Sequence, residues 1–159
     1  MNPGFFSMSF TPPGPKAAPV PRRAAAESDT GLPAEPGHSR ILIVEDNYFV
    51  SLTIENALAD AGYEVLGVVD SGEEALELAR NETPHLVLMD IRLAGKMDGI
   101  EAAIALRAMG ITCVMASAHS DDDMKRRGAE AQPAGWLVKP FSDADLVAAV
   151  QLALRRRTN

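Results

Sequence analysis

Short apolar runs that end in a polar side chain constrain the fold of this chain more than any other feature of its sequence. The run Leu86–Met89 stops at Asp90, and an apolar run of this length is typical of a parallel strand buried on both faces. The carboxyl ends of parallel strands meet at one edge of a sheet, where open α/β sheets bind ligands, so residues that end such runs should lie together. Three more runs end in this way: Ile41–Val44 before Glu45-Asp46, Thr112–Ala116 before Ser117, and Trp136–Val138 before Lys139.

Capping residues and helical spacing occupy the segments between the runs. Asn47 is placed to cap a helix from Tyr48 to about Ala61, which Gly62 would end. Ser120 and the acids at 121–123 open another helix, and Pro133 ends it early. Three pairs have the spacing of a capping box: Ser71 with Glu74, Asp98 with Glu101, and Ser142 with Asp145.

With a further strand over Val65–Val69, the pattern is five βα units, which predicts a parallel sheet with right-handed crossovers. The apolar residues at helical spacing should face its core. They are Phe49, Val50, Ile54, Ala57, Leu58 and Ala61 in the first helix; Ala75, Leu76 and Ala79 in the second; Ile100, Ala103, Ile104 and Leu106 in the third; and Leu146, Val147, Val150 and Leu154 in the last.

Composition narrows the classes of function and separates a tail from a domain. Residues 1–39 hold 8 of the 11 prolines without strand or helix periodicity, which predicts a disordered tail before a domain at 40–159. The tail has three basic and three acidic groups, so the net charge of −7 lies in the domain and disfavours nucleic acid as a partner. No apolar run approaches the roughly 18 residues of a membrane span. With the lone Cys113 in an apolar run, the cytoplasm is the expected location.

The polar residues at the predicted edge suit phosphoryl chemistry. Glu45, Asp46 and Asp90 would form a cluster of hard oxygen ligands of the kind Mg²⁺ prefers, and a cation would relieve their mutual repulsion. Lys139 would supply a positive charge to a phosphoryl oxygen and Ser117 a hydroxyl. These are the parts needed for in-line phosphoryl transfer to a carboxylate. The sequence has neither of the common glycine-rich phosphate loops, which disfavours a nucleotide site.

Four local signatures make the chain from Arg40 to Arg157 resemble the receiver domain of bacterial two-component response regulators. They are Val44-Glu45-Asp46-Asn47, Leu88-Met89-Asp90, Ser117-Ala118 and Lys139-Pro140-Phe141. The resemblance implies a flavodoxin-like, doubly wound (βα)5 fold with a five-stranded parallel sheet in the order 2-1-3-4-5. It also implies that the Lys139–Pro140 peptide bond is cis.

The resemblance further implies a role for each matching residue. Asp90 would accept a phosphoryl group from a sensor histidine kinase or a histidine phosphotransfer protein. Mg²⁺, or Mn²⁺ in its place, would be held by Glu45, Asp46, Asp90 itself and the backbone carbonyl of Arg92. Ser117 would move to the phosphoryl group and Lys139 would pair with it. Trp136 would swing inward as Ser117 moves, or it serves ordinary packing on a strand.

The sequence departs from the family pattern in the loop after Asp90. Ala94 stands where most receivers have proline, and the loop gains one residue in the segment Ala94–Met97. Arg92 and His119 occupy variable positions that tune phosphoryl lifetime in the family. Arg92 would shield the phosphoryl group or pair with an acid, and His119 would tune its lifetime or be a solvated loop residue.

A stand-alone response regulator is therefore the expected function. It would catalyse only its own phosphorylation and dephosphorylation, as a monomer or a phosphorylation-linked dimer. Output would come from protein contact through helix 4, strand 5 and helix 5, or from draining phosphate as a sink. The alternatives are a pseudo-receiver that is never phosphorylated and a phosphatase with an aspartyl-phosphate intermediate. The phosphatase class usually needs a second Asp where this chain has Arg92.

Overall fold

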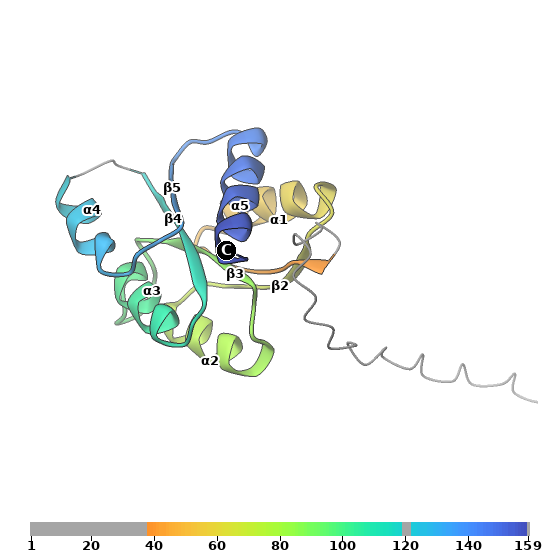
Figure 1. The fold of residues 1–159 in the computed structure, drawn as a ribbon. Coiled ribbons are helices and arrows are strands. Elements are labelled where there is room, and N and C mark those ends of the chain that lie inside the picture. Colours follow the sequence, from red (N-terminus) through yellow and green to blue (C-terminus); the bar gives the residue numbers. More distant parts are fainter. Residues whose placement is uncertain (1–37, 119–121, 159) are drawn as a thin grey trace, which may run out of the picture. The chain divides into compact units, whose positions relative to one another are not determined.

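The computed structural model describes residues 38–118 and 122–158. Within them, strands and helices alternate along the chain (Figure 1). The elements are β1 (Arg40–Val44), α1 (Tyr48–Asp60), β2 (Glu64–Val69), α2 (Gly72–Glu82), β3 (Leu86–Asp90), α3 (Gly99–Ala108), β4 (Thr112–Ser117), α4 (Asp122–Ala129), β5 (Gly135–Val138) and α5 (Asp143–Arg157). No helix in these ranges is long and apolar enough to cross a membrane.

The five strands form one parallel sheet in the order β2-β1-β3-β4-β5, which confirms the predicted fold. Strand β3 is central and all five of its residues are buried. In the register of the sheet, Asp90 pairs with Ala116, and Ser117 pairs with Val138. The polar residues that follow the strands therefore share one edge, because parallel strands all end on the same side.

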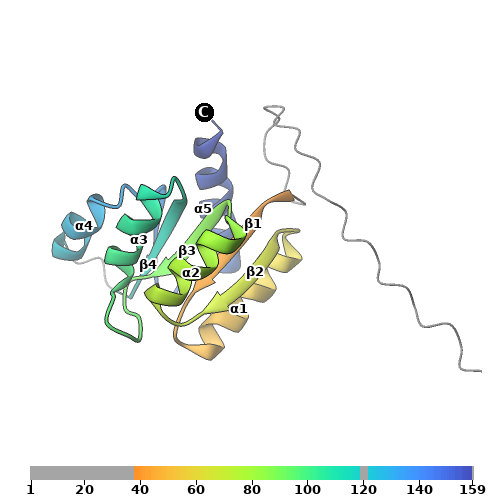
Figure 2. The same ribbon diagram turned by 90° about the horizontal axis from the view of Figure 1, so that it is seen from below.

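Helices cover both faces of the sheet (Figure 2). One apolar core lies between the sheet and helices α2 and α3, and it includes Met89 and Leu106. The other lies between the sheet and helices α1 and α5, and it includes Leu88 and Leu146. Successive residues of β3 enter opposite cores, as the two-residue period of a strand requires.

Most predicted caps are present. Asn47 accepts from the amides of Phe49 and Val50, and Gly62 follows α1 with φ +88°. The Ser71 hydroxyl accepts from the Glu74 amide. Both halves of the capping box form at Asp98–Glu101 and at Ser142–Asp145.

Two predictions about helices were wrong in detail. Phe49 was expected in the core, but its side chain is 78% exposed and Ser51 is buried instead. Ser51 can be buried because its hydroxyl donates to the carbonyl of Tyr48, so no polar group is left unpaired. Helix α4 does end early, but at Ala129 rather than at Pro133. The predictions for residues 1–37 and for the start of that helix at Ser120 lie outside the described residues.

Candidate functional site

Three acidic residues gather at the carboxyl edge of the sheet, as the sequence predicts. Glu45 and Asp46 follow β1, and Asp90 ends β3. Each offers a carboxylate oxygen within 4.8 Å of the others. Glu45 is 4% exposed and Asp90 7% exposed, whereas Asp46 lies open to solvent.

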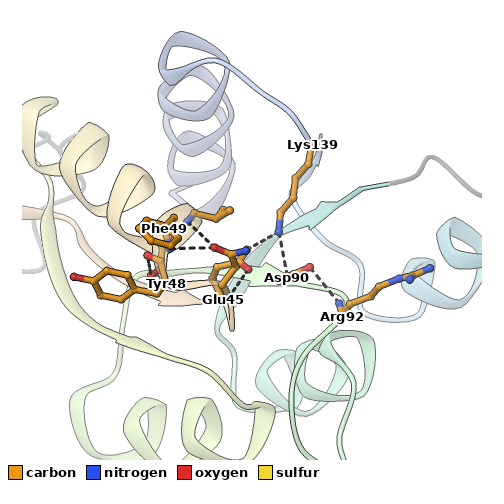
Figure 3. A network of polar contacts seen from close by, with 9 residues as sticks. Glu45, Tyr48, Phe49, Asp90, Arg92 and Lys139 are labelled. Atoms are coloured by element: carbon orange, nitrogen blue, oxygen red, sulfur yellow. Dashed lines mark hydrogen bonds and ion pairs between the residues drawn. The ribbon is translucent and has the colours of Figure 1, made fainter.

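Lys139 reaches this cluster from the loop after β5 (Figure 3). Its Nζ lies 2.5 Å from Oε2 of Glu45 and 3.1 Å from Oδ2 of Asp90. The Lys139–Pro140 peptide bond is cis, as the family resemblance implied. The Lys139 amide donates to the Ser117 carbonyl over 2.8 Å, so the start of this loop is fixed to the end of β4.

The electrostatics of the cluster follow from burial and from two acids that share one cation. Burial raises the pKa of Glu45 and the Asp90 charge adds to this, against the hydrogen bonds from Lys139 and the Asn47 amide. Burial alone would lower the pKa of Lys139, but its hydrogen bond to Glu45 and the two carboxylates raise it overall. Lys139 is therefore charged at neutral pH. The charged form of Glu45 is disfavoured by burial and by Asp90, and a further cation would stabilise it.

The donor set fits a divalent metal ion. Three carboxylates supply the hard oxygen ligands that Mg²⁺ binds, and exposed Asp46 leaves one side open to water. Oδ1 of Asp90 accepts from the Arg92 amide over 3.2 Å, which fixes the carboxylate and the chain that follows it. The Arg92 carbonyl, the fourth expected ligand, lies on this same short segment.

The structure brings some of the other predicted residues to this edge and not others. Ser117 is buried at the end of β4, one residue beyond the partner of Asp90 in the register. Trp136 lies further back on β5, where it packs partly buried against the core shared by α2 and α3. The Arg92 side chain is exposed and extends away from the carboxylates (Figure 3). His119 is outside the described residues.

Sequence reasoning missed Gly99, which positions the phosphoacceptor candidate. A Cβ placed on Gly99 would lie 1.9 Å from the backbone oxygen of Asp90, so only glycine allows α3 to begin there. The Gly99 amide donates to the Ile91 carbonyl over 2.9 Å and ties the helix to the end of β3. The Asp98-Gly99 pair was visible in the sequence, but the contact that explains it was not.

An apolar hollow opens beside Lys139. Exposed Phe49 is one of its lining residues. The lining comes from the start of α1 and the segments after β4 and β5: Phe49, Val50, Thr53, Ile54, Ala118, Lys139, Pro140 and Phe141. The Phe49 ring also meets Tyr48 edge to face, with the ring centroids 5.6 Å apart. Phe49, which was expected in the core, therefore belongs to an exposed surface next to the acids.

Comparisons with known proteins show the family of this chain. The family described as "Response regulator receiver domain" matches residues 41–151. The transcriptional regulatory protein PdtaR of Mycobacterium tuberculosis is 38% identical over 118 residues, which are 74% of this chain and 57% of PdtaR. PrrA of the same species is 39% identical over 132 residues, 81% of this chain and 54% of PrrA. The chain thus spans about half the length of these curated relatives.

Solved structures give the same answer. The signal receiver domain of a modulated diguanylate cyclase from Desulfovibrio desulfuricans G20 superposes with a TM-score of 0.71 and 34% identity, covering 74% of this chain and 94% of that one. The BeF3-activated receiver domain of Klebsiella pneumoniae RstA gives 0.68 and 30%, covering 74% and 99%. The fold and its acidic edge are those of a two-component signalling module. The chain belongs to the response regulator receiver domain family.

Proposed function

We propose that Asp90 accepts a phosphoryl group from a phosphorylated histidine on a sensor kinase or phosphotransfer protein. One observation carries the proposal: Lys139 Nζ contacts both Glu45 and Asp90 within a cluster of three carboxylates. A partly buried lysine shared by two acids holds a positive charge beside the carboxylate that would become phosphorylated. Such a charge favours both the approach of the phosphoryl group and the product.

In the proposed step, a carboxylate oxygen of Asp90 attacks phosphorus while the bond from phosphorus to the donor imidazole nitrogen breaks. The imidazole leaves with that electron pair, and the product is an acyl phosphate on Asp90. Lys139 pairs with a phosphoryl oxygen, and the Ser117 hydroxyl donates to another. Mg²⁺ held by Glu45, Asp46, Asp90 and the Arg92 carbonyl would neutralise charge that develops on the phosphoryl oxygens.

Phosphorylation would then shift a two-state equilibrium read by other proteins. The elements we expect to change are Ser117, Trp136 and the face from α4 to α5, because the side chain of Trp136 extends from β5 to Gly128 of α4. The chain would act in the cytoplasm as a signalling switch or a phosphate sink, and as an enzyme only on its own phosphoryl group. Arg92 and His119 stay candidates for setting phosphoryl lifetime, as their positions in the sequence predict.

The test is intact-mass spectrometry after incubation with acetyl phosphate, with and without Mg²⁺. Wild type should gain the mass of one phosphoryl group only with Mg²⁺, and Asp90→Asn should gain none. Asp143→Asn is the matched control, since Asp143 is an exposed acid at the start of α5 and outside the cluster. If neither acetyl phosphate nor a panel of phosphorylated histidine kinases modifies the wild type, the chain is a pseudo-receiver.

A further inference from the structure

The lengthened loop after Asp90 lies against the first turn of α2. Ala94 forms an isolated parallel bridge with Ser71, the N-cap of that helix. Gly95 follows with φ +98°, a backbone conformation that side chains disfavour. The loop thus turns at Gly95 and stays against the first turn of α2 before it reaches Asp98.

The carboxylate of Glu73 holds the loop in this course. Oε1 of Glu73 accepts from the Lys96 amide over 3.2 Å and from the Met97 amide over 3.1 Å. The pKa of Glu73 is lowered, first by its own backbone amide and then by these two loop amides. Three amides converging on one carboxylate form an arrangement that favours its charged form.

Close packing supports the same contact on either side. A Cβ on Gly95 would lie 3.0 Å from Oε2 of Glu73. A Cβ on Gly72 would lie 3.1 Å from Cγ of Met97, so the start of α2 and the loop approach each other as closely as glycine allows. The lengthened loop therefore packs closely against the first turn of α2.

The segment held in this way begins at the candidate phosphoacceptor. The Arg92 amide donates to Asp90, and the Arg92 carbonyl is the backbone ligand expected for the metal. Loop residues 93–97 connect this ligand directly to the amides that Glu73 binds. If the loop left α2, the Arg92 carbonyl at its start would turn away from the metal position. The segment between them is short, so it has few torsion angles that could absorb the movement.

We propose that Glu73 is a positioning residue, which fixes the loop through Lys96 and Met97 and so holds the Arg92 carbonyl ready for the metal. This inference rests on the proposed function of the acidic cluster. Glu73 touches neither the acids nor the phosphoryl group, so its effect would pass through the loop alone. The apparent affinity for the metal is proportional to the fraction of molecules whose site is already formed, so it decreases when that fraction decreases. Mg²⁺ binding is therefore the sensitive readout.

The experiment compares Glu73→Ala and Glu73→Gln with Glu74→Ala. Glu74 is an acid on the same turn, and it lines a hollow together with Glu45 and Asp46, which Glu73 does not. A purely electrostatic effect on a cation would therefore be at least as large for Glu74→Ala. Among the described residues, no loop amide donates to the Glu74 carboxylate.

Two measurements are made on each variant: Mg²⁺ affinity by calorimetry, and hydrogen exchange of the Lys96 and Met97 amides without metal. We expect Glu73→Ala to raise the Kd for Mg²⁺ about fivefold and to speed exchange of both amides about tenfold. Glu73→Gln keeps an acceptor oxygen and should stay within about twofold of wild type in affinity. Glu74→Ala should change the affinity less than twofold and leave the exchange unaltered.

The outcomes separate the inference from the function on which it rests. Wild-type affinity in Glu73→Ala, or equal losses in Glu73→Ala and Glu74→Ala, would overturn the positioning role while leaving the metal site intact. Unchanged amide exchange in Glu73→Ala would overturn it as well, because Glu73 would then not hold the loop. A wild-type chain that binds no Mg²⁺ would overturn the proposed function itself, and this inference with it.

Discussion

Helices α3 and α4 are successive in the chain and are held to the domain by different means. Helix α3 buries five of its ten residues, namely Gly99, Ile100, Ala102, Ala103 and Leu106. Helix α4 buries one of its eight, Gly128. Apolar burial is worth about 25 cal/mol per Å², so α3 is anchored by the core, whereas α4 depends on contacts at its surface.

Within residues 38–118 and 122–158, specific contacts hold the surface of α4. Arg127 lies 2.6 Å from Oδ2 of Asp98, the N-cap of α3. Nη1 of Arg107 donates to the Glu130 carbonyl, just after α4, over 2.9 Å. The Trp136 ring covers Gly128 so closely that a Cβ there would lie 2.4 Å from Cη2. Met124 adds a partly buried side chain to the core.

The difference indicates which helix can move at low cost. Exposed ion pairs contribute about 0–1 kcal/mol each, so detaching α4 costs far less than detaching α3. Helix α4 also touches Trp136, the residue expected to respond to phosphorylation. A well-anchored α3 that begins against Asp90, the proposed phosphoacceptor, next to a loosely held α4 is an arrangement suited to a switch.

The largest expected effect comes from breaking the anchor of α3. Gly99→Ala should lower the free energy of unfolding by about 3 kcal/mol or more, because the new Cβ would meet the backbone oxygen of Asp90, which cannot move aside. Urea denaturation measures the loss. Gly110→Ala is the control: its Cβ meets nothing within 4 Å, and only its φ of +76° costs about 1–2 kcal/mol. Equal losses in the two variants would contradict the anchoring role.

A smaller effect is expected from the matching change in α4. Gly128→Ala places a methyl group against the Trp136 ring, and the ring or the helix can shift to admit it. The clash should cost about 1–3 kcal/mol, offset by about 1 kcal/mol because alanine favours a helix. Trp136 is the only tryptophan, so its emission reports the shift, which should be to longer wavelength as the ring meets water.

The control for this variant is Lys125→Ala, an exposed change in the same helix. It should leave the emission of Trp136 unaltered. Unchanged emission in Gly128→Ala would mean that the ring does not depend on this glycine.

These contacts show what the sequence could and could not reveal. The buried strands were predictable because both faces of a parallel sheet demand apolar side chains, as at Leu86–Met89. The acids and Lys139 were placed correctly because the topology sends strand ends to one edge. Local signals were sufficient for both.

Contacts between distant segments left no such signal. Glu73 contacts Lys96, which is 23 residues away in the sequence, and Arg127 contacts Asp98, which is 29 residues away. In the sequence, each of these residues looks like an ordinary charged residue of the surface. Phe49 was misplaced because helical spacing gives the face of a helix but not where the sheet beneath it ends. The lengthened loop was recognised, whereas the surface on α2 that receives it required the structure.

Removing the ion pair between Arg127 and Asp98 tests how α4 is held to α3 without disturbing either core. Arg127→Ala should lower global stability by about 0.5 kcal/mol, since the paired side chains are 53% and 35% exposed. Hydrogen exchange in α4 should rise while exchange in α3 stays unchanged. Arg126→Ala is the control, because Arg126 pairs with Asp123 inside the same helix. Faster exchange in both helices would mean that they open as one unit.

The smallest effect is expected from protonating the acid shared by the two helices. Burial alone would raise the pKa of Asp98, but the Glu101 amide and Arg127 together hold it below the usual 3.8. The unfolded chain then binds more protons than the native one between these two pKa values, so stability contributed by Asp98 is complete above 3.8 and declines as pH falls.

Asp98→Asn isolates this contribution, because asparagine still caps α3 but carries no charge for Arg127. Wild type should exceed the variant in urea stability by a constant amount above about pH 5. The difference should shrink toward pH 3 as Asp98 is protonated. A difference independent of pH would place the stabilisation in the shape of the cap and not in the ion pair, and the contacts of α4 with Trp136 and Arg107 and the packing of Met124 would then matter more than Arg127.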